Sequence, residues 1–188
     1  MSLLFCHFNK VPADKTVIPV HVLGNDEWEL FAAALPPAQF NFAKARNFTA
    51  ETGQRLRLPD ADGHIVSVLF GAGRQAKDDV GAIRAGSLSA AMPAGYYKFE
   101  RLPSGWAEDL AAIGWGIGAY KFDRYLSKDI VTPTLVIGDT LDLKYINSAV
   151  DATKLCRDLI NTPASDMGPI ALHEAVAKLA QTLSLIHI

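Results

Sequence analysis

The chain has 188 residues, of which 49% are hydrophobic and 20% are charged, and its formal net charge is −2. This length is sufficient for one ordinary domain with a hydrophobic core, and the composition is that of a soluble globular protein. The near-neutral charge gives no support to a nucleic-acid or membrane-surface partner. No stretch approaches the roughly 18 unbroken apolar residues that a membrane span requires.

The amino terminus and the cysteines favour a cytoplasmic location. Met1–Lys10 has no basic region ahead of its apolar residues, so it predicts a first strand rather than a secretory signal. Cys6 and Cys156 lie far apart and fit no metal-binding spacing. We therefore expect two buried, reduced thiols, as is usual in the cytoplasm.

The first third of the chain predicts two strands and a helix. Runs rich in Val, Ile and Leu predict strands at Leu3–Phe8 and Thr16–Leu23. A helix should follow, with Asn25 or Asp26 as its N-cap and Pro36-Pro37 as its end. Its buried face is predicted from apolar residues at helical spacing, which are Trp28, Phe31, Ala32 and Leu35.

The middle of the chain predicts a hairpin and a second helix. The strands Gln54–Leu58 and His64–Phe70 are separated by the turn-forming residues Pro59–Gly63. A helix over Asp79–Met92 should be broken by Pro93–Gly95, and Tyr96–Glu100 should form a short strand.

A glycine-containing helix is expected next. Ser104 is its candidate N-cap, and its apolar face is formed by Trp106, Leu110, Ile113 and Ile117. Glycines at 114, 116 and 118 each weaken a helix by about 1 kcal/mol relative to alanine, so they predict close packing against a neighbour. The strand Thr134–Ile137 follows.

Two helices complete the predicted elements. The helix Leu143–Ile160 has one apolar face, formed by Ile146, Ala149, Val150, Thr153, Cys156 and Ile160. A last helix begins at Pro169, and its face contains Leu172, Ala175, Val176 and Leu179. Strands alternate with helices, so the predicted class is α/β with a mixed sheet.

Few residues suggest chemistry by themselves. Gly71–Ala76 fits the form G-x-G-x-x-A of a dinucleotide-binding turn, but Asp78 and Asp79 follow it, so a tight structural turn is the preferred interpretation. His173-Glu174 lacks the second histidine of a zinc-protease motif and predicts a solvated pair. Asp60 and Asp62 lie in a turn composition, and surface positions are expected for Arg101 and Arg124.

The sequence RDLINTPASDMGP, Arg157–Pro169, is very similar to a hallmark segment of the leucyl aminopeptidase family. In that family the segment leaves an interdomain helix and enters the catalytic domain. Three further segments resemble the family in the same order, VLFGAG (68–73), MPAGYYKFE (92–100) and GWGIGAYKFDRY (114–125). The resemblance extends over nearly the whole chain, from Leu3 to Gln181.

The resemblance implies a fold and a division into domains. Residues 1–142 should form an amino-terminal α/β domain, a mixed sheet flanked by helices that is macro-domain-like. Residues 143–162 should form the interdomain helix, and 163–182 the start of a truncated catalytic domain.

The resemblance also implies a function for the full-length parent protein. Members remove amino-terminal residues from peptides with two divalent metals, zinc or manganese, and assemble as cytoplasmic hexamers. Their metal ligands lie in the motifs GKGxxFDxGG and NTDAEGR, and neither occurs in this sequence. We therefore expect no catalytic or metal-binding residue here. A structural role is implied for the matching residues Asn161, Thr162, Pro163, Ser165, Asp166, Met167 and Gly168.

The last six residues, Leu183–Ile188, depart from the family pattern. They correspond to the codons CTG TCT CTT ATA CAC ATC, which resemble a transposase end used in sequencing libraries. We therefore expect the natural protein to lack them and to continue beyond Gln181. Two other hypotheses remain open, a free-standing ligand-binding module of macro-like or dinucleotide type and a nucleic-acid-binding accessory domain, because some bacterial members of the family bind DNA.

Overall fold

The computed structural model of the chain describes residues 4–74, 79–126 and 132–184. Six strands form one mixed sheet in the order β1-β6-β5-β2-β4-β3. All neighbouring strands are parallel except β3 and β4, which form the predicted antiparallel hairpin. The strands are β1 (Phe5–His7), β2 (Val17–Gly24), β3 (Arg55–Pro59), β4 (Ile65–Gly73), β5 (Tyr96–Arg101) and β6 (Thr134–Ile137).

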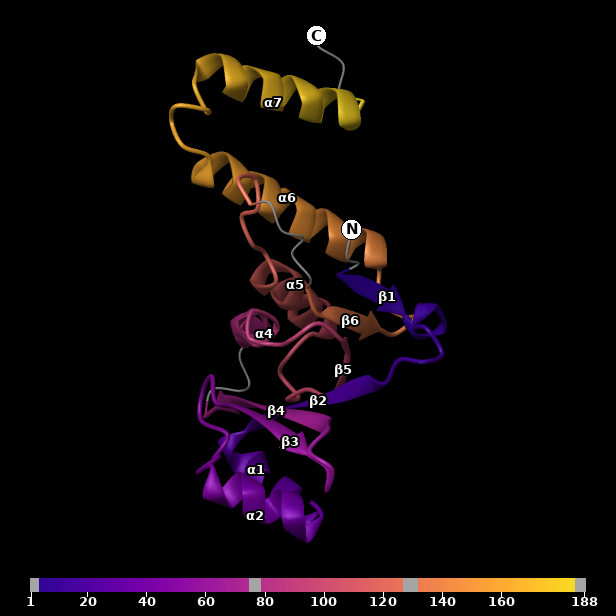
Figure 1. The fold of residues 1–188 in the computed structure, drawn as a ribbon. Coiled ribbons are helices and arrows are strands. Elements are labelled where there is room, and N and C mark those ends of the chain that lie inside the picture. Colours follow the sequence, from indigo (N-terminus) through magenta and orange to yellow (C-terminus); the bar gives the residue numbers. More distant parts are fainter. Residues whose placement is uncertain (1–3, 75–78, 127–131, 185–188) are drawn as a thin grey trace.

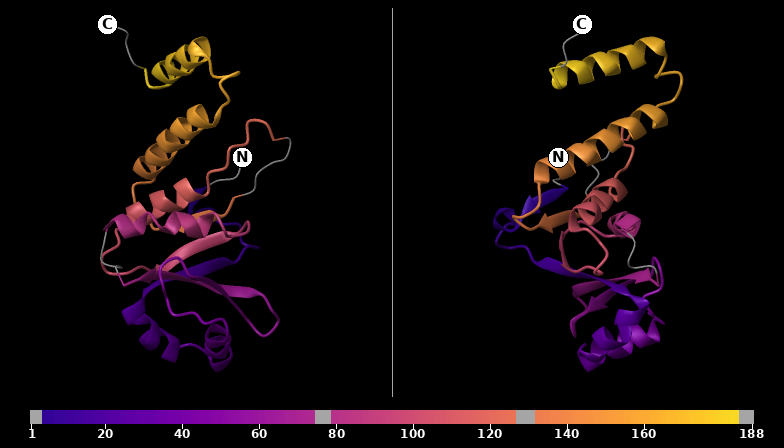
Figure 2. Two further views of the ribbon diagram at one scale, coloured as in Figure 1. Left: turned by 90° about the vertical axis from the view of Figure 1, so that its left-hand side faces the viewer. Right: turned by 180° about the vertical axis from the view of Figure 1, so that it is seen from behind.

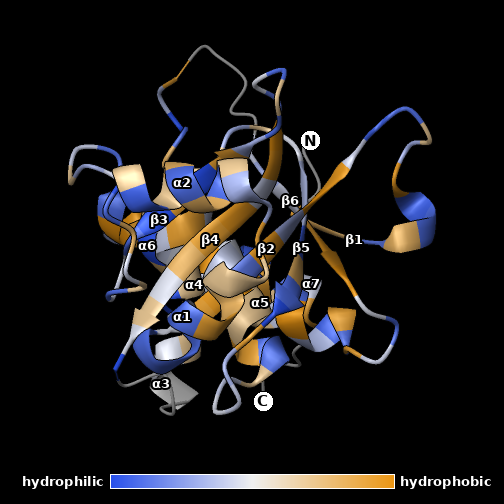
Figure 3. Cartoon of the chain, turned by 90° about the horizontal axis from the view of Figure 1, so that it is seen from below, coloured by the Kyte–Doolittle hydropathy of each residue, from blue (hydrophilic) through white to orange (hydrophobic). Residues whose placement is uncertain are grey.

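Helices cover the sheet on both faces, so the predicted α/β class is confirmed (Figure 1). One face carries α3 (Asp79–Ala82), α4 (Ala85–Ser89) and α5 (Glu108–Gly118). The long helix α6 (Leu143–Asn161) packs on α5. On the other face, α1 (Asn25–Ala33) and α2 (Pro37–Ala45) lie over β2, β3 and β4 (Figure 3). A short 3-10 helix, Phe8–Lys10, follows β1.

The last helix, α7 (Pro169–Thr182), lies beyond α6 at the end of the molecule opposite α1 and α2 (Figures 1 and 2). Its apolar face is largely open, because Ile170, Leu172, Val176 and Leu179 are all exposed. No helix among the described residues is long and apolar enough to cross a membrane.

Two separate cores result from the alternation of side chains along the strands. On β4, Val68 and Phe70 face the larger core under α3–α6, whereas Leu69 faces the smaller core under α1 and α2. Side chains alternate in this way because successive residues of a strand point to opposite faces of its sheet. The short runs rich in Val, Ile and Leu that predicted the central strands are therefore those of a sheet buried on both faces.

The glycines of α5 allow the close packing that their spacing predicted. A Cβ atom added to Gly118 would lie 1.8 Å from the carbonyl oxygen of Gly86 in α4. One added to Gly116 would lie 2.6 Å from the Val150 side chain of α6. The helix is therefore held between two others at distances that only glycine permits.

The region around α1 and α2 corrects two predictions. The N-cap of α1 is Gly24, rather than Asn25 or Asp26, and its backbone N–H donates to the Glu27 carboxylate at 2.9 Å. The pair Pro36-Pro37 does not simply end a helix, because Pro37 is the first residue of α2. A proline suits this position, where its missing N–H would have had no partner within the helix.

Two more boundaries differ from the predictions. The single helix predicted over Asp79–Met92 is divided into α3 and α4, since the residues between them turn. The N-cap of α5 is Ala107, so Ser104 does not cap this helix. One difference places a turn between α3 and α4, and the other starts α5 later than predicted.

The apolar face predicted for α6 is buried only along its first half. Ile146 and Val150 belong to the larger core, whereas Ile160 at the last turn is 81% exposed. Cys6 is buried as expected, but Cys156 is exposed, so the prediction of two buried thiols was wrong for Cys156. The second half of α6 is more exposed because α6 extends past the end of α5, the helix on which it packs.

Candidate functional site

The segment Asn161–Gly168, here called the junction segment, connects α6 to α7. The backbone N–H of Thr162 donates to the Asp158 carbonyl at 3.1 Å, and Thr162 is buried as the C-cap of α6. The N–H groups of Asp166 and Met167 both donate to the Pro163 carbonyl at 2.9 Å. Gly168 is the N-cap of α7. The backbone of this segment is therefore folded into a defined turn.

A second segment, Tyr120–Tyr125, follows α5 and contacts α6 through its first tyrosine. The Tyr120 hydroxyl donates to Asp158 Oδ1 at 2.8 Å and accepts from the Asn161 side-chain amide at 3.1 Å. Both partners lie on the last turns of α6. The Tyr120 hydroxyl therefore binds two side chains near the carboxyl end of α6.

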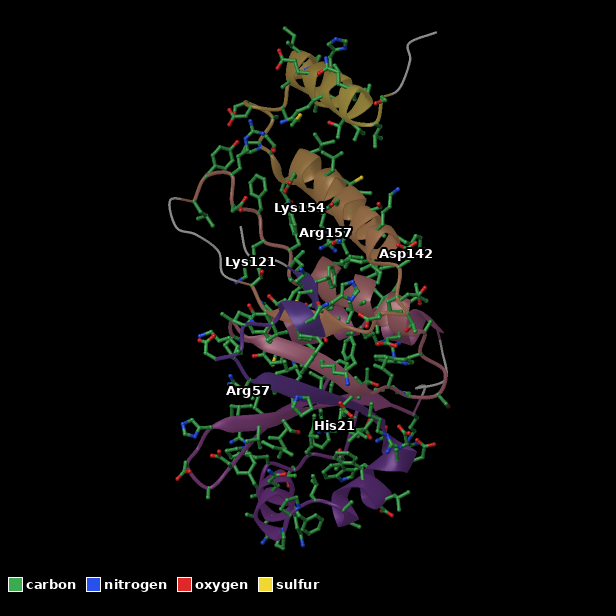
Figure 4. The ribbon with its side chains drawn as sticks, turned by 90° about the vertical axis from the view of Figure 1, so that its right-hand side faces the viewer. His21, Arg57, Lys121, Asp142, Lys154 and Arg157 are labelled. Atoms are coloured by element: carbon green, nitrogen blue, oxygen red, sulfur yellow. The ribbon has the colours of Figure 1, made fainter. Side chains whose placement is uncertain are left out.

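Arg157 reinforces the same contact from α6. Its guanidinium donates to the Ile117 carbonyl at 2.7 Å and lies 5.4 Å from the centre of the Tyr120 ring. Figure 4 shows Arg157 between α6 and α5. A cation at the carboxyl end of a helix interacts favourably with the unpaired carbonyls there. Arg157 thus joins the end of α5 to the last third of α6.

The remaining contacts tie the junction segment itself to the 120–125 segment. Arg124 donates to the Thr162 hydroxyl at 3.2 Å, and the Tyr125 hydroxyl donates to the Asp166 carboxylate. This hydrogen bond lowers the pKa of Asp166 and raises the pKa of Tyr125, because it is strongest when the carboxylate is charged and the phenol neutral. We call this set of contacts the junction clamp: Tyr120, Arg124, Tyr125, Arg157, Asp158, Asn161, Thr162 and Asp166.

The structure brings together only part of the residue set that the sequence singled out. Asn161, Thr162 and Asp166 use their side chains in the clamp, while Pro163 and Gly168 contribute backbone turns. Ser165 is exposed and Met167 is half-buried. Arg124, expected only to be a surface residue, is exposed but partnered. Both segments resemble the family in sequence, but the sequence alone does not show that they meet.

The described residues do not fit a two-metal catalytic centre. The one group of acids and histidines close enough to share an ion among them is Asp60, Asp62 and His64, and all three are exposed on the hairpin turn. The Asp60 carboxylate already accepts the backbone N–H groups of Asp62 and His64, at 3.0 and 2.8 Å. The Asp60 carboxylate thus shapes the turn between β3 and β4.

The glycines of the G-x-G-x-x-A pattern are occupied by the protein's own backbone. A Cβ atom on Gly71 would lie 2.1 Å from the Glu51 carbonyl oxygen, and Gly73 has a φ of +75° and donates to the Ala50 carbonyl. The close approach that these glycines permit is therefore made by the segment just before β3. Gln75, Ala76 and Asp78 lie outside the described residues.

The amino terminus of α1 is also occupied by side chains of the protein itself. The Glu27 carboxylate accepts the Gly24 N–H at the start of α1 and pairs with Arg101 at 2.8 Å. This position, at the carboxyl ends of β2 and β5, is where open parallel sheets commonly bind phosphates. Here an internal anion and cation fill it. His173 and Glu174 are both exposed on α7, as predicted.

Residues 18–137 match the family profile described as the M17 aminopeptidase, N-terminal domain. This range includes all of β2 but its first residue, the strands β3 to β6 and the helices α1 to α5. The chain belongs to the M17 aminopeptidase family. No curated protein sequence matches the chain.

Three solved structures have a similar fold. Cytosol aminopeptidase from Coxiella burnetii matches with a TM-score of 0.77 and 24% identity over 95% of this chain. The bottromycin maturation enzyme BotP matches with a TM-score of 0.69 and 23% identity over 90% of the chain. A tomato leucine aminopeptidase variant matches with a TM-score of 0.65 and 16% identity over 98% of the chain.

The chain spans well under half the length of these structures. It covers 38% of the Coxiella and BotP chains and 43% of the tomato chain. The junction clamp, α6 and α7 lie largely outside the residues matched by the M17 profile. Their likeness to the solved structures rests on the structural alignments, which extend over nearly the whole chain.

Proposed function

We infer that the chain is the amino-terminal accessory part of a leucyl aminopeptidase that removes amino-terminal residues from peptides. The match of residues 18–137 to the M17 N-terminal domain is the observation that carries this proposal. The chain itself is inactive, because hydrolysis of an amide at neutral pH requires an activated water and the described residues offer no buried ligand cluster to activate one.

The proposed division follows the sequence expectation. Residues 1–142 form the accessory domain, 143–162 the interdomain helix and 163–182 the beginning of the catalytic domain. The parent would be a cytoplasmic hexamer that uses two manganese or zinc ions, with peptides as substrates. In support of a metal-dependent parent, a solved structure of the bottromycin maturation enzyme BotP is a complex with Mn. The near-neutral charge of this chain favours no nucleic-acid partner.

The junction clamp has a structural role in this proposal. Six side-chain contacts around the end of α6 fix the direction in which the chain leaves the accessory domain. The helix α7 then presents an apolar face with exposed Ile170, Val176 and Leu179. In a full-length enzyme this face would be covered by the rest of the catalytic domain, since exposed apolar surfaces of this kind mark contact sites.

An activity assay and the gene sequence test the proposal together. The purified chain with leucine p-nitroanilide and Mn²⁺ should release no nitroaniline above the rate of a metal-only blank. The gene, read beyond the codon for Gln181, should encode the two metal-binding motifs of the family. Turnover that survives repurification would disprove the inactivity, and a reading frame without those motifs would contradict the aminopeptidase parent.

The alternative of a dinucleotide-binding module makes an opposite prediction. Because Glu27 and Arg101 fill the terminus of α1, we expect ADP-ribose and NAD to show no saturable heat of binding in calorimetry. Micromolar binding that is lost in Gly73→Val would favour the module instead.

A further inference from the structure

The helices α1 and α2 line an open pocket of about 530 Å³ on the side of the molecule far from the junction clamp. In Figure 1 this is the end opposite α7. The volume lies within the range of sites that hold small molecules. The lining residues come from both helices and the turn after them: Trp28, Glu29, Ala32, Ala33, Phe40, Lys44, Asn47, Phe48 and Thr49.

The floor of the pocket is aromatic and held in place. Trp28 and Phe48 meet edge to face with ring centres 4.9 Å apart, and Phe48 is only 5% exposed. Asn47 has a φ of +51°, the left-handed conformation common just after a helix, and turns the chain so that Phe48 returns beneath Trp28. Ala32 and Ala33 leave room where larger side chains of α1 would fill the space.

The walls carry one charge of each sign. Glu29 of α1 and Lys44 of α2 both line the pocket, and both are exposed. Among the side chains that the structure describes, neither takes part in an ion pair, although five other pairs form. Phe40 lines the same pocket and is 38% exposed. The pocket thus combines free opposite charges with an apolar surface that a ligand could cover.

We propose that this pocket binds a zwitterionic α-amino acid with a large apolar side chain. The side chain lies against the rings of Trp28, Phe40 and Phe48, where burial removes apolar surface from water. The ammonium group of the ligand pairs with Glu29 and its carboxylate with Lys44. A purely apolar ligand would leave both charges unused, and a purely anionic or cationic one would approach a like charge. This site goes beyond the proposed function and does not rest on it.

Nuclear magnetic resonance of the indole N–H groups tests the site with L-phenylalanine as the probe. The chain has three tryptophans, and Trp106 and Trp115 are buried in the larger core, so they serve as internal controls. L-phenylalanine should shift only the Trp28 signal, in a saturable way, with a dissociation constant on the order of 1 mM. Glycine lacks the side chain, 3-phenylpropanoate the ammonium group and 2-phenylethylamine the carboxylate, and each should bind at least about fivefold more weakly.

Three variants of the lining and two matched controls locate the site. Glu29→Gln and Lys44→Gln should each weaken binding of L-phenylalanine by about fivefold. Ala33→Phe should abolish it by filling the pocket, and Ala33 is exposed, so the fold should tolerate the change. Asp26→Asn and Arg46→Gln change exposed charges near the same helices that do not line the pocket, and both should bind normally.

Several results would overturn the proposal. The absence of a saturable Trp28 shift would show that no such site exists. Equal affinity for 3-phenylpropanoate or 2-phenylethylamine would show that recognition of the zwitterion is wrong. Unchanged binding in Ala33→Phe would place the ligand elsewhere on the chain.

Discussion

Tyr120 and Asp158, which are 38 residues apart in the chain, are joined by a hydrogen bond of 2.8 Å between the phenol and the carboxylate. The same hydroxyl accepts the Asn161 amide at 3.1 Å. Tyr120 comes just after α5, whereas its partners lie on α6. The packing of α6 on α5 is thereby extended by polar contacts beyond the last buried apolar residue of α6, Val150.

Removing this hydroxyl tests whether the junction clamp stabilises the end of α6. We expect Tyr120→Phe to lower the free energy of unfolding by about 0.5 kcal/mol, because the lost bonds are partly open to water. Hydrogen exchange should increase at the amides of the last turn of α6, measured by mass spectrometry. Tyr145→Phe is the matched control on α6, since Tyr145 is 53% exposed. Equal exchange in the two variants would mean that the clamp does not restrain the helix.

The contact between α4 and α5 predicts a larger effect. In Gly118→Ala the new methyl group would start 1.8 Å from the Gly86 carbonyl oxygen, so the two helices must separate. We expect a loss of about 2–3 kcal/mol in urea unfolding, as overpacked cores show. Gly138→Ala is the control, because the nearest atom to its added Cβ is 3.7 Å away. A loss below about 0.5 kcal/mol for Gly118→Ala would contradict the observed spacing of α4 and α5.

The central strands and most helices could be predicted because their signals are local. Val68 and Phe70 face one core and Leu69 faces the other. Because both faces are buried, all three residues are apolar, and the strand can be recognised in the sequence as a short apolar run. The helix α2 was missed because Pro36-Pro37 was interpreted only as a stop. A proline is compatible with the end of one helix and with the first turn of the next, so the residues after it decide between the two.

The remaining differences arise from contacts between distant residues. The break between α3 and α4 accommodates Trp106, whose indole lies against Gly81, and the carbonyl of Gly86 facing Gly118. Neither neighbour can be recognised from the local sequence. The junction clamp was hidden for the same reason, since no spacing rule indicates that Tyr120 approaches α6. The family resemblance identified both segments, but only the fold shows that they touch.

The half-buried His21 predicts a pH dependence of stability. Burial lowers the pKa of His21, an effect partly offset by the charge of Glu100, and the centre of its ring lies 4.9 Å from that of the tilted Phe31 ring. Figure 4 shows His21 between the sheet and α1. Because the folded pKa lies below the unfolded one, the unfolded chain takes up a proton first as the pH falls. Stability from this group is therefore constant above the ordinary histidine pKa of about 6.5 and decreases below it until the folded pKa is reached.

The measurement compares unfolding free energies at about pH 7.5 and pH 5.5 for the original chain and His21→Gln. Carboxylates and other histidines contribute to both proteins, so the quantity of interest is the difference between their two pH changes. The variant should lose less stability on acidification. His173→Gln, at an exposed position on α7, should lose as much as the original chain. Identical losses in all three proteins would show that His21 titrates normally.

The last prediction compares the two halves of the α6 face, which was predicted from the sequence as one continuous apolar face. Val150 is 3% exposed and packs on Gly116, whereas Ile160 is 81% exposed. Val150→Asp should lower the free energy of unfolding by about 3–5 kcal/mol, because it buries a charge without a partner. Ile160→Asp should cost only a few tenths of a kcal/mol, from the unfavourable position of an anion near a helix carboxyl end. Thermal and urea unfolding of both variants measure the contrast. A large loss for Ile160→Asp would mean that the end of α6 is covered within this chain, and the clamp would then be a minor part of its attachment.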